Sequence, residues 1–400
     1  MADLNQTPSA NRVHIAFFGK RNAGKSSVVN AVTGQQMSIV SEVKGTTTDP
    51  VSKAMELLPL GPVVIIDTPG MDDSGDVGEL RVQRARQVLN KTDVAVLVVD
   101  AAMGVSETDE ALCALFRKKG VPCITVFNKS DLHAVACSGE NEIAVSALTG
   151  ENIFALKEKI AALAKGSENQ KVILGDLLEK GDMVVLVTPI DSSAPKGRMI
   201  LPQVQAIRDI LDAQAMCTIT QPDQLAQVLA GLHTPPKLVV TDSQAFGRVK
   251  EIVPESLPLT SFSILFARYK GVLETAVRGA AALEQLRDGD RVLIAEGCTH
   301  HRQCEDIGTV KLPDWIRQHT GTTPTFDFTS GGGFPEDLSP YALIVHCGGC
   351  MLNEREMQYR QSAAEEAGVP YTNYGILIAY MNGILKRSLA PFSEYADILK

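Results

Sequence analysis

The sequence predicts an α/β protein with three successive domains, and three observations lead to this prediction. Apolar runs of strand length alternate with helical patterns through most of the 400 residues. A Gly-rich octet follows the first apolar run, and two motifs rich in Cys and His follow two later runs. A helical pattern, ENIFALKEKIAALAKG, closes the first domain near residue 168. We expect the three domains to span residues 1–168, 169–262 and 263–400.

Composition limits the classes of partner and compartment. The net charge is −9 and no block of Lys and Arg is present, so a nucleic-acid partner has no electrostatic support. The longest apolar stretches, such as residues 94–99, are too short to span a bilayer, so we expect no membrane partner. The N-terminal segment has no charged region followed by an apolar one, which predicts a cytoplasmic protein. Eight cysteines in such a chain favour metal or thiol chemistry over disulfides.

The first apolar run, residues 13–19, leads into a phosphate-binding pattern. Residues 19–26 fit the pattern G-x4-G-K-S/T, and the following residues favour a helix. In such a loop the glycines let backbone N–H groups surround the phosphates, while Lys25 reaches the β/γ oxygens and Ser26 can bind Mg2+. The residues expected to contact the nucleotide here are Gly19, Asn22, Ala23, Gly24, Lys25, Ser26 and Ser27.

Two further motifs follow in the order expected for a nucleotide hydrolase. Thr46 and Thr47, in GTTTDP, can close over the γ-phosphate and Mg2+. In DTPG, Asp67 would hold the metal and the amide of Gly70 would sense the γ-phosphate. We therefore expect the catalytic set to be Lys25, Thr47, Asp67 and Gly70.

A fourth and a fifth motif select guanine. In NKSD, which contains Asn128 and Lys129, the Asp131 carboxylate can accept two hydrogen bonds from the N1 and N2 edge of guanine. Adenine cannot supply these two donors. Ser146 and Ala147 follow, and would bring a backbone N–H to guanine O6. Five motifs in this order predict binding of GTP and GDP with Mg2+.

The nucleotide motifs resemble those of the tRNA-modifying and ribosome-assembly GTPases that carry Asn in the phosphate loop. The resemblance implies that Asn22 helps to hold K+, which acts in place of an arginine finger. Met71 stands where a water-orienting Gln is found in Ras-like proteins, so we expect slow, potassium-stimulated hydrolysis. The alternative role of Asn22 is to cap the loop.

The middle of the chain alternates strand and helix patterns without a catalytic grouping. Strand patterns such as residues 183–190 and 237–242 flank helical patterns, which predicts a small parallel α/β domain. The simplest use of such a domain is docking or dimerisation, so we expect a homodimer.

The two Cys and His motifs each follow a predicted buried strand. Cys298 and His300 come just after the run at residues 291–295, and HCGGC (His346, Cys347, Cys350) comes just after the run at 341–345. If the sheet is parallel, both motifs emerge at the same carboxyl edge and converge there. The sequence thus predicts a soft-ligand metal site.

Three explanations compete for these cysteines. Burial in the core explains Cys113, Cys123, Cys137 and Cys217, which lie in apolar patterns, but it explains the motif cysteines poorly. Three cysteines and a histidine can complete a tetrahedral zinc site. The same cysteines can hold an iron–sulfur cluster with a fourth ligand that is not cysteine. Spacing does not separate zinc from iron–sulfur.

Taken together, the motifs resemble those of the [FeFe]-hydrogenase maturation GTPases of the HydF family. GTTTDP, DTPGMDD and NKSD carry this resemblance in the first half, and AEGCTHH, TSGGGFP, HCGGCM and NYGI carry it in the last. It implies a P-loop GTPase domain, a small α/β dimerisation domain and an α/β domain that binds a [4Fe–4S] cluster. The implied cluster ligands are Cys298, Cys347 and Cys350, with His300 and His346 as possible ones.

The resemblance also implies a function and partners. The protein would be a scaffold or carrier that delivers a transient di-iron subcluster to the hydrogenase apo-enzyme, after radical maturation enzymes have loaded it. The alternative from a different class is a zinc-stabilised regulatory GTPase of the ribosome-assembly or tRNA-modification type. That alternative predicts a colourless protein with stoichiometric zinc, whereas the scaffold predicts an oxygen-sensitive brown one.

Overall fold

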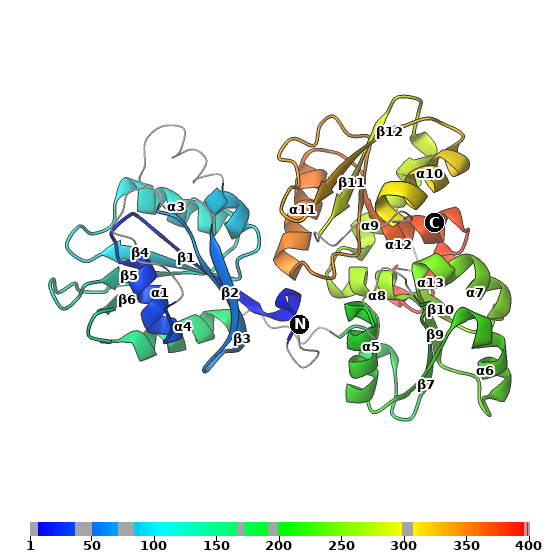
Figure 1. Ribbon diagram of the computed structural model, residues 1–400, viewed down its shortest axis with the longest axis horizontal. Coiled ribbons are helices and arrows are strands. Elements are labelled where there is room, and N and C mark those ends of the chain that lie inside the picture. Colours follow the sequence, from blue (N-terminus) through cyan, green and yellow to red (C-terminus); the bar gives the residue numbers. More distant parts are fainter. Residues whose placement is uncertain are drawn as a thin grey trace. The chain divides into compact units, whose positions relative to one another are not determined.

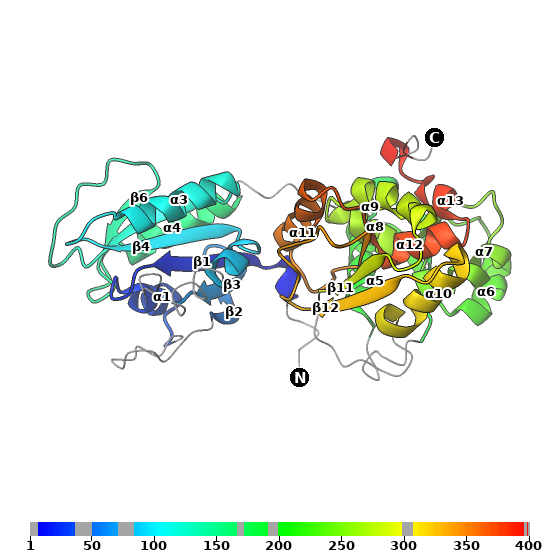
Figure 2. The same ribbon diagram turned by 90° about the horizontal axis from the view of Figure 1, so that it is seen from above.

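The computed structural model describes residues 7–36, 50–70, 84–165, 172–190, 199–297, 307–395 and 398. Its contacts divide the chain into two compact units, residues 1–169 and 170–400. Each unit packs helices over sheets that are wholly or mainly parallel, which confirms the predicted α/β fold class (Figure 1 and Figure 2).

The first unit contains a six-stranded sheet in the order β2-β3-β1-β4-β5-β6. All neighbours in it are parallel except β2 and β3. Its inner strands are continuous apolar runs because helices cover both faces of the sheet. The strands are β1 (Val13–Gly19), β2 (Val51–Leu57), β3 (Gly61–Asp67), β4 (Val94–Asp100), β5 (Cys123–Asn128) and β6 (Glu142–Val145).

Two core clusters lie on opposite faces of this sheet. Helices α1 (Lys25–Thr33) and α4 (Ile153–Lys165) pack on the face that contains Phe17. Helix α3 (Glu107–Lys118) and the helical residues 84–89 pack on the other face, which contains Phe18. A short 3-10 turn, Ser9–Asn11, precedes β1.

The second unit contains two four-stranded parallel sheets, in the orders β10-β9-β7-β8 and β12-β11-β13-β14. The first comprises β7 (Met183–Val187), β8 (Met216–Thr220), β9 (Leu238–Thr241) and β10 (Leu259–Ser261). The second comprises β11 (Arg291–Glu296), β12 (Thr325–Ser330), β13 (Leu343–His346) and β14 (Tyr371–Asn373).

Nine α-helices of the described part of this unit accompany these strands. They are α5 (Leu201–Asp212), α6 (Leu225–Gly231), α7 (Phe246–Ile252), α8 (Phe262–Tyr269), α9 (Leu273–Ala280), α10 (Leu312–Thr320), α11 (Glu354–Glu366), α12 (Tyr374–Met381) and α13 (Leu385–Leu389). Short 3-10 turns lie at Gly175–Leu177, Pro222–Gln224, Ser243–Ala245, Ala281–Gln285 and Ser393–Tyr395, and a π-helical turn lies at Ile307–Lys311.

The two sheets of the second unit are repeats of one α/β plan. Read in reverse, the second order is β14-β13-β11-β12, which matches β10-β9-β7-β8 strand for strand. The registers match as well, because Val184 pairs with Leu238 in the first sheet and Val292 pairs with Leu343 in the second. We call the part from β7 to α9 the first repeat and the part from β11 to α13 the second repeat.

The repeats exchange their last helices. Helix α9 of the first repeat packs on β14 of the second, where the Thr372 hydroxyl donates to the Ala276 carbonyl at 2.8 Å. Helix α13 of the second repeat packs on β10 of the first. One core cluster consequently runs from Ile173 to Phe392, across the boundary predicted between residues 262 and 263. That boundary stays a prediction.

Candidate nucleotide and metal sites

The predicted phosphate loop is a left-handed turn between β1 and α1. Asn22 has a φ of 62° and Gly24, which caps α1, has a φ of 81°. A Cβ at Gly24 would lie 2.2 Å from Nδ2 of Asn128, so only glycine fits there. Asn22 and Ser27 are exposed, while Ala23 is buried under the loop.

Three side chains suited to Mg2+ and phosphate meet at the start of α1. The Ser26 hydroxyl donates to Asp67 Oδ2 at 2.8 Å, and Lys25 Nζ lies 3.4 Å from Asp67 Oδ1. Lys25 and Asp67 are each 8% exposed, so the pair is almost fully desolvated. Gly70, after β3, lies against the backbone of Arg21. The donor set fits Mg2+, which prefers carboxylate and hydroxyl oxygens. Thr46 and Thr47 lie outside the described residues.

The guanine motif is tied to the phosphate loop through its first two residues. Asn128 donates from Nδ2 to the Ala23 carbonyl at 3.0 Å and accepts from the Ala147 N–H at 3.1 Å. Lys129 Nζ donates to the Asn22 carbonyl at 3.0 Å and to Asp100 Oδ2 at 2.6 Å. These bonds hold three separate loops in one arrangement.

Asp100 is a site residue that the sequence analysis missed. It ends β4, and the hydrogen bond from Lys129 lowers the pKa of its carboxyl group. Its position at the carboxyl end of the apolar run 94–99 was the available signal. Asp131 is exposed beyond β5, and the buried hydroxyl of Ser146 accepts from the Thr149 N–H at 3.1 Å.

The second candidate site lies where β11 and β13 end side by side. Their parallel pairing places Ala295 opposite His346, and the Cys347 N–H donates to the Ala295 carbonyl at 2.8 Å. The Gly297 N–H then donates to Cys347 Sγ at 3.1 Å. Cys298 and His300 lie outside the described residues, but Gly297 immediately precedes Cys298 in the chain.

The CxxC turn is shaped to present two thiols. The Gly349 N–H also donates to Cys347 Sγ, at 3.4 Å, and Gly349 has a φ of 60° with Met357 Sδ 2.3 Å from where a Cβ would lie. Burial raises the pKa of Cys347 to about 11 and also raises that of Cys350. Two thiols at one sheet edge, one of them already accepting two backbone N–H groups, fit thiolate ligands of an iron–sulfur cluster.

His346 is fully buried and uses both ring nitrogens. Nδ1 lies 2.7 Å from the Cys347 carbonyl and Nε2 lies 3.0 Å from Arg360 Nη1. Because an arginine can only donate, Nε2 is the acceptor and Nδ1 carries the proton. Burial and the Arg360 charge lower the pKa of His346 to about 3. In this arrangement, binding iron through Nε2 would displace Arg360.

Arg360, on α11, was also missed by the sequence analysis. It is 1% exposed and pairs with Glu356, with Nε to Oε1 at 3.0 Å, while Nη2 donates to the Gly331 carbonyl at 2.6 Å. Its guanidinium also lies 5.1 Å from the centre of the Phe334 ring. One side chain thus joins α11, β13 and the loop after β12.

Lys270 is the third missed residue. It is 3% exposed, its ammonium donates to the Leu352 carbonyl, and burial lowers its pKa to about 8. Cys350, Glu354 and Cys347 oppose this lowering of the pKa through the negative charges that they carry when ionised. A buried cation therefore lies within electrostatic range of the two motif thiols.

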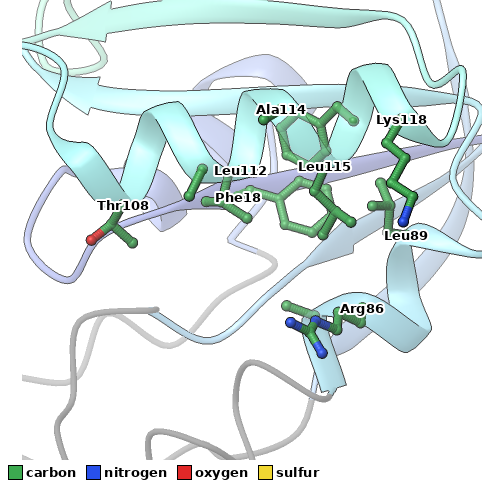
Figure 3. A pocket seen from close by; sticks show the side chains of 11 residues that line it. Phe18, Arg86, Leu89, Thr108, Leu112, Ala114, Leu115 and Lys118 are labelled. Atoms are coloured by element: carbon green, nitrogen blue, oxygen red, sulfur yellow. The ribbon is translucent and has the colours of Figure 1, made fainter.

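A separate pocket of about 410 Å³ lies beside α3 in the first unit. Figure 3 shows mostly apolar side chains around it, among them Phe18, Leu112 and Leu115, with Arg86 and Lys118 beside them. None of its lining residues belongs to the predicted nucleotide site, so it adds nothing to that site.

Two features are absent from the described part of the chain. No helix among them has the length and apolar character needed to cross a bilayer. No group of three or more His, Cys, Asp or Glu side chains is arranged among them to hold a metal ion. Two of the five predicted cluster ligands, Cys298 and His300, are not part of that set.

Sequence models of known families match most of the chain. The hydrogen maturase F dimerization domain matches residues 173–271, and the hydrogen maturase F tetramerization domain matches residues 274–391. A 50S ribosome-binding GTPase model matches residues 14–129, so the first unit carries a GTPase domain.

Curated relatives match a smaller part. The GTPase Der of Kosmotoga olearia is 39% identical over 137 residues, 33% of this chain and 31% of the relative. The tRNA modification GTPase MnmE of Neisseria meningitidis serogroup C is 36% identical over 154 residues, 37% of this chain and 34% of the relative. The chain thus spans about a third of the length of these relatives. A solved structure of Era from Aquifex aeolicus is 20% identical, with a TM-score of 0.35 over 52% of this chain and 93% of that chain.

Proposed function

The chain belongs to the hydrogen maturase F family, and from that premise we propose a GTP-hydrolysing scaffold that binds a [4Fe–4S] cluster. It assembles or delivers the di-iron subcluster of the [FeFe]-hydrogenase active site to the apo-hydrogenase. The observation that carries the proposal is the 3.1 Å bond between Gly297 N–H and Cys347 Sγ, because Gly297 directly precedes Cys298 in the chain and Cys347 belongs to the other cysteine motif.

The cluster ligands are Cys298, Cys347 and Cys350. Three thiolates leave one iron position for a ligand that is not cysteine, and an exchangeable position is what a carrier requires when its cargo has to leave intact. The chain's own residues prepare the site: Gly297 and Gly349 donate N–H groups to Cys347 Sγ. His300 and His346 are the other residues of the motif, and His346 is held by Arg360.

The nucleotide site binds GTP with Mg2+ and hydrolyses it slowly. Lys25 faces the β/γ phosphates, and Ser26, Thr47 and Asp67 hold the metal; the 2.8 Å bond between Ser26 and Asp67 supports this grouping. Closure of the loops with Thr46, Thr47, Asp72 and Asp73 over the γ-phosphate acts as a switch for partner docking. Partners are the apo-hydrogenase, the radical maturation enzymes that load the scaffold and a second copy of the chain, all in the cytoplasm.

Anaerobic reconstitution with iron and sulfide tests the cluster. We expect wild type to show a reducible cubane EPR signal that is lost in Cys298→Ala, Cys347→Ala and Cys350→Ala. Cys137→Ala is the matched control and should keep the signal, since Cys137, which the sequence analysis wrongly expected in the core, is an exposed cysteine of the GTPase unit. A colourless wild type that holds tight zinc would overturn the scaffold in favour of a zinc-stapled regulatory GTPase.

Potassium dependence tests the hydrolysis mechanism. Asn22 holds K+ beside the phosphates, so the GTP hydrolysis rate should be higher in KCl than in NaCl at equal ionic strength. Asn22→Ala should remove the difference between the two salts. Equal rates for wild type would instead leave Asn22 as a loop cap, a role that its left-handed φ of 62° also suits.

A further inference from the structure

Lys270 reaches the cysteine site from the other repeat. It follows α8 in the first repeat, and its N–H donates to the Phe266 carbonyl at 2.9 Å. The matching position of the second repeat, after α12, is Asn382, whose N–H donates to the Ile378 carbonyl at 3.0 Å. A glycine with positive φ follows in both. The backbone is the same at Lys270 and Asn382, so the two positions differ in the side chain, and the one near the cysteines carries a lysine.

The ammonium of Lys270 lies beneath the turn that joins Cys350 to α11. It donates to the Leu352 carbonyl, and Leu352 itself packs against Gly297. The carboxylate that acts on the pKa of Lys270 is that of Glu354, in the first turn of α11. The lysine thus contacts the loop that carries one cysteine motif and, through Leu352, the residue preceding the other.

Resting on the proposed function, we infer that Lys270 is a positioning residue of the cluster site, which sets its charge balance and holds the CxxC turn. A cluster with three thiolate ligands carries net negative charge, which grows by one unit on reduction. A buried cation nearby favours the reduced form, because the interaction is only weakly screened there. Removing the cation lowers the midpoint potential, since potentials of such clusters follow net charge and hydrogen bonding.

The test measures the midpoint potential of the reconstituted cluster by EPR-monitored titration, with iron content per chain. We expect Lys270→Met to shift the midpoint to a more negative value, while Lys270→Arg stays near wild type. Lys270→Gln keeps a donor for the Leu352 carbonyl but has no charge, and should shift with the Met variant. The matched control is Lys250→Met, because Lys250 Nζ also donates to a backbone carbonyl of this unit, that of Asn382 at 3.1 Å.

Each outcome decides one question. A midpoint unchanged in both the Met and the Gln variants overturns the role of Lys270. A midpoint that shifts in the Met variant alone also overturns it, because the lysine would then act as a neutral donor. If the Met variant does not fold, the Gln and Arg variants still make the comparison of charge. A wild type that takes up no iron contradicts the proposed function itself, whatever Lys270 does.

Discussion

Asp131 is exposed beyond β5, where its carboxylate can accept two hydrogen bonds from guanine N1 and N2. Replacing Asp131 by Asn turns one acceptor into a donor that faces the guanine amino group. We expect the affinity for GTP to fall by about 3 kcal/mol, roughly a hundredfold, as two charge-assisted bonds are lost. Affinity for xanthosine triphosphate, which has a carbonyl at that position, should rise. Fluorescent-nucleotide titration measures both, and an unchanged preference for GTP would contradict the role of Asp131.

Arg360 is a buried charge with several partners, so removing it should be costly. Arg360→Met leaves Glu356 without its buried cation and His346 Nε2 without its donor. Breaking a buried ion pair from one side costs about 3–5 kcal/mol. We expect a loss of that size in urea unfolding of the second unit, with Arg208→Met as the control, since its partner Asp212 is exposed. A loss of unfolding free energy below 1 kcal/mol would contradict the role of Arg360 in joining α11, β13 and the loop after β12.

How much of each site was predictable depends on where its residues stand in the chain. Contact between Ser26 and Asp67 follows from motif order, because strand-end loops of one parallel sheet meet at one edge. Asp100, Lys270 and Arg360 belong to no short motif. A buried charge can be recognised only when the elements that bury it are known. Lys270, after α8, and Arg360, on α11, contact the cysteine turn through tertiary packing, which the local sequence does not reveal.

Among the elements, the strands that are continuous apolar runs, such as those at residues 291–295 and 341–345, were predictable from the sequence. The parallel neighbours that a shared site requires are present in β11 and β13. The repeat was missed by the sequence analysis, although the similar segments PLTSF (258–262) and PYTNY (370–374) stand at matching positions in the two halves of the unit. The two repeats need only bury the same faces, and many combinations of apolar residues satisfy that requirement, so local sequence reveals the repeat weakly.

The packing of α9 on β14 depends on Gly279. A Cβ there would lie 2.0 Å from the Tyr371 carbonyl oxygen, which is backbone and cannot turn aside. Overpacking of this kind costs about 1–3 kcal/mol, so we expect Gly279→Ala to lower the unfolding free energy of the second unit. Gly231→Ala at the end of α6 meets no atom within 4 Å and should be neutral or stabilising. Equal unfolding midpoints for the two variants in urea would show that α9 does not press on β14.

At the scale of the molecule, the largest core cluster of the second unit crosses the point near residue 272 where the two matching family models meet. Helix α8 contacts α9 and α12, and α13 lies on β10, so covering helices of each repeat come from the other. Buried apolar side chains on both sides of the division belong to the same cluster; they include Phe262, Ile264, Leu265, Ile376, Leu377, Leu385 and Leu389. The repeats consequently share their stability.

Separating the repeats should therefore unfold both. Four buried side chains of α12 and α13 are lost to residues 172–280 when the chain is divided after α9, and each contributes about 1.5–3 kcal/mol. Their sum is comparable to the 5–15 kcal/mol that stabilises a typical domain. We expect residues 172–280 and 281–400, expressed separately, to lack a cooperative urea transition, and residues 172–400 to show one. Mixing the two fragments should restore the transition, because the exchanged helices can then pack. Two fragments that each unfold cooperatively alone would mean that the repeats are independent domains, and that Lys270 reaches the cysteine turn across an ordinary interface.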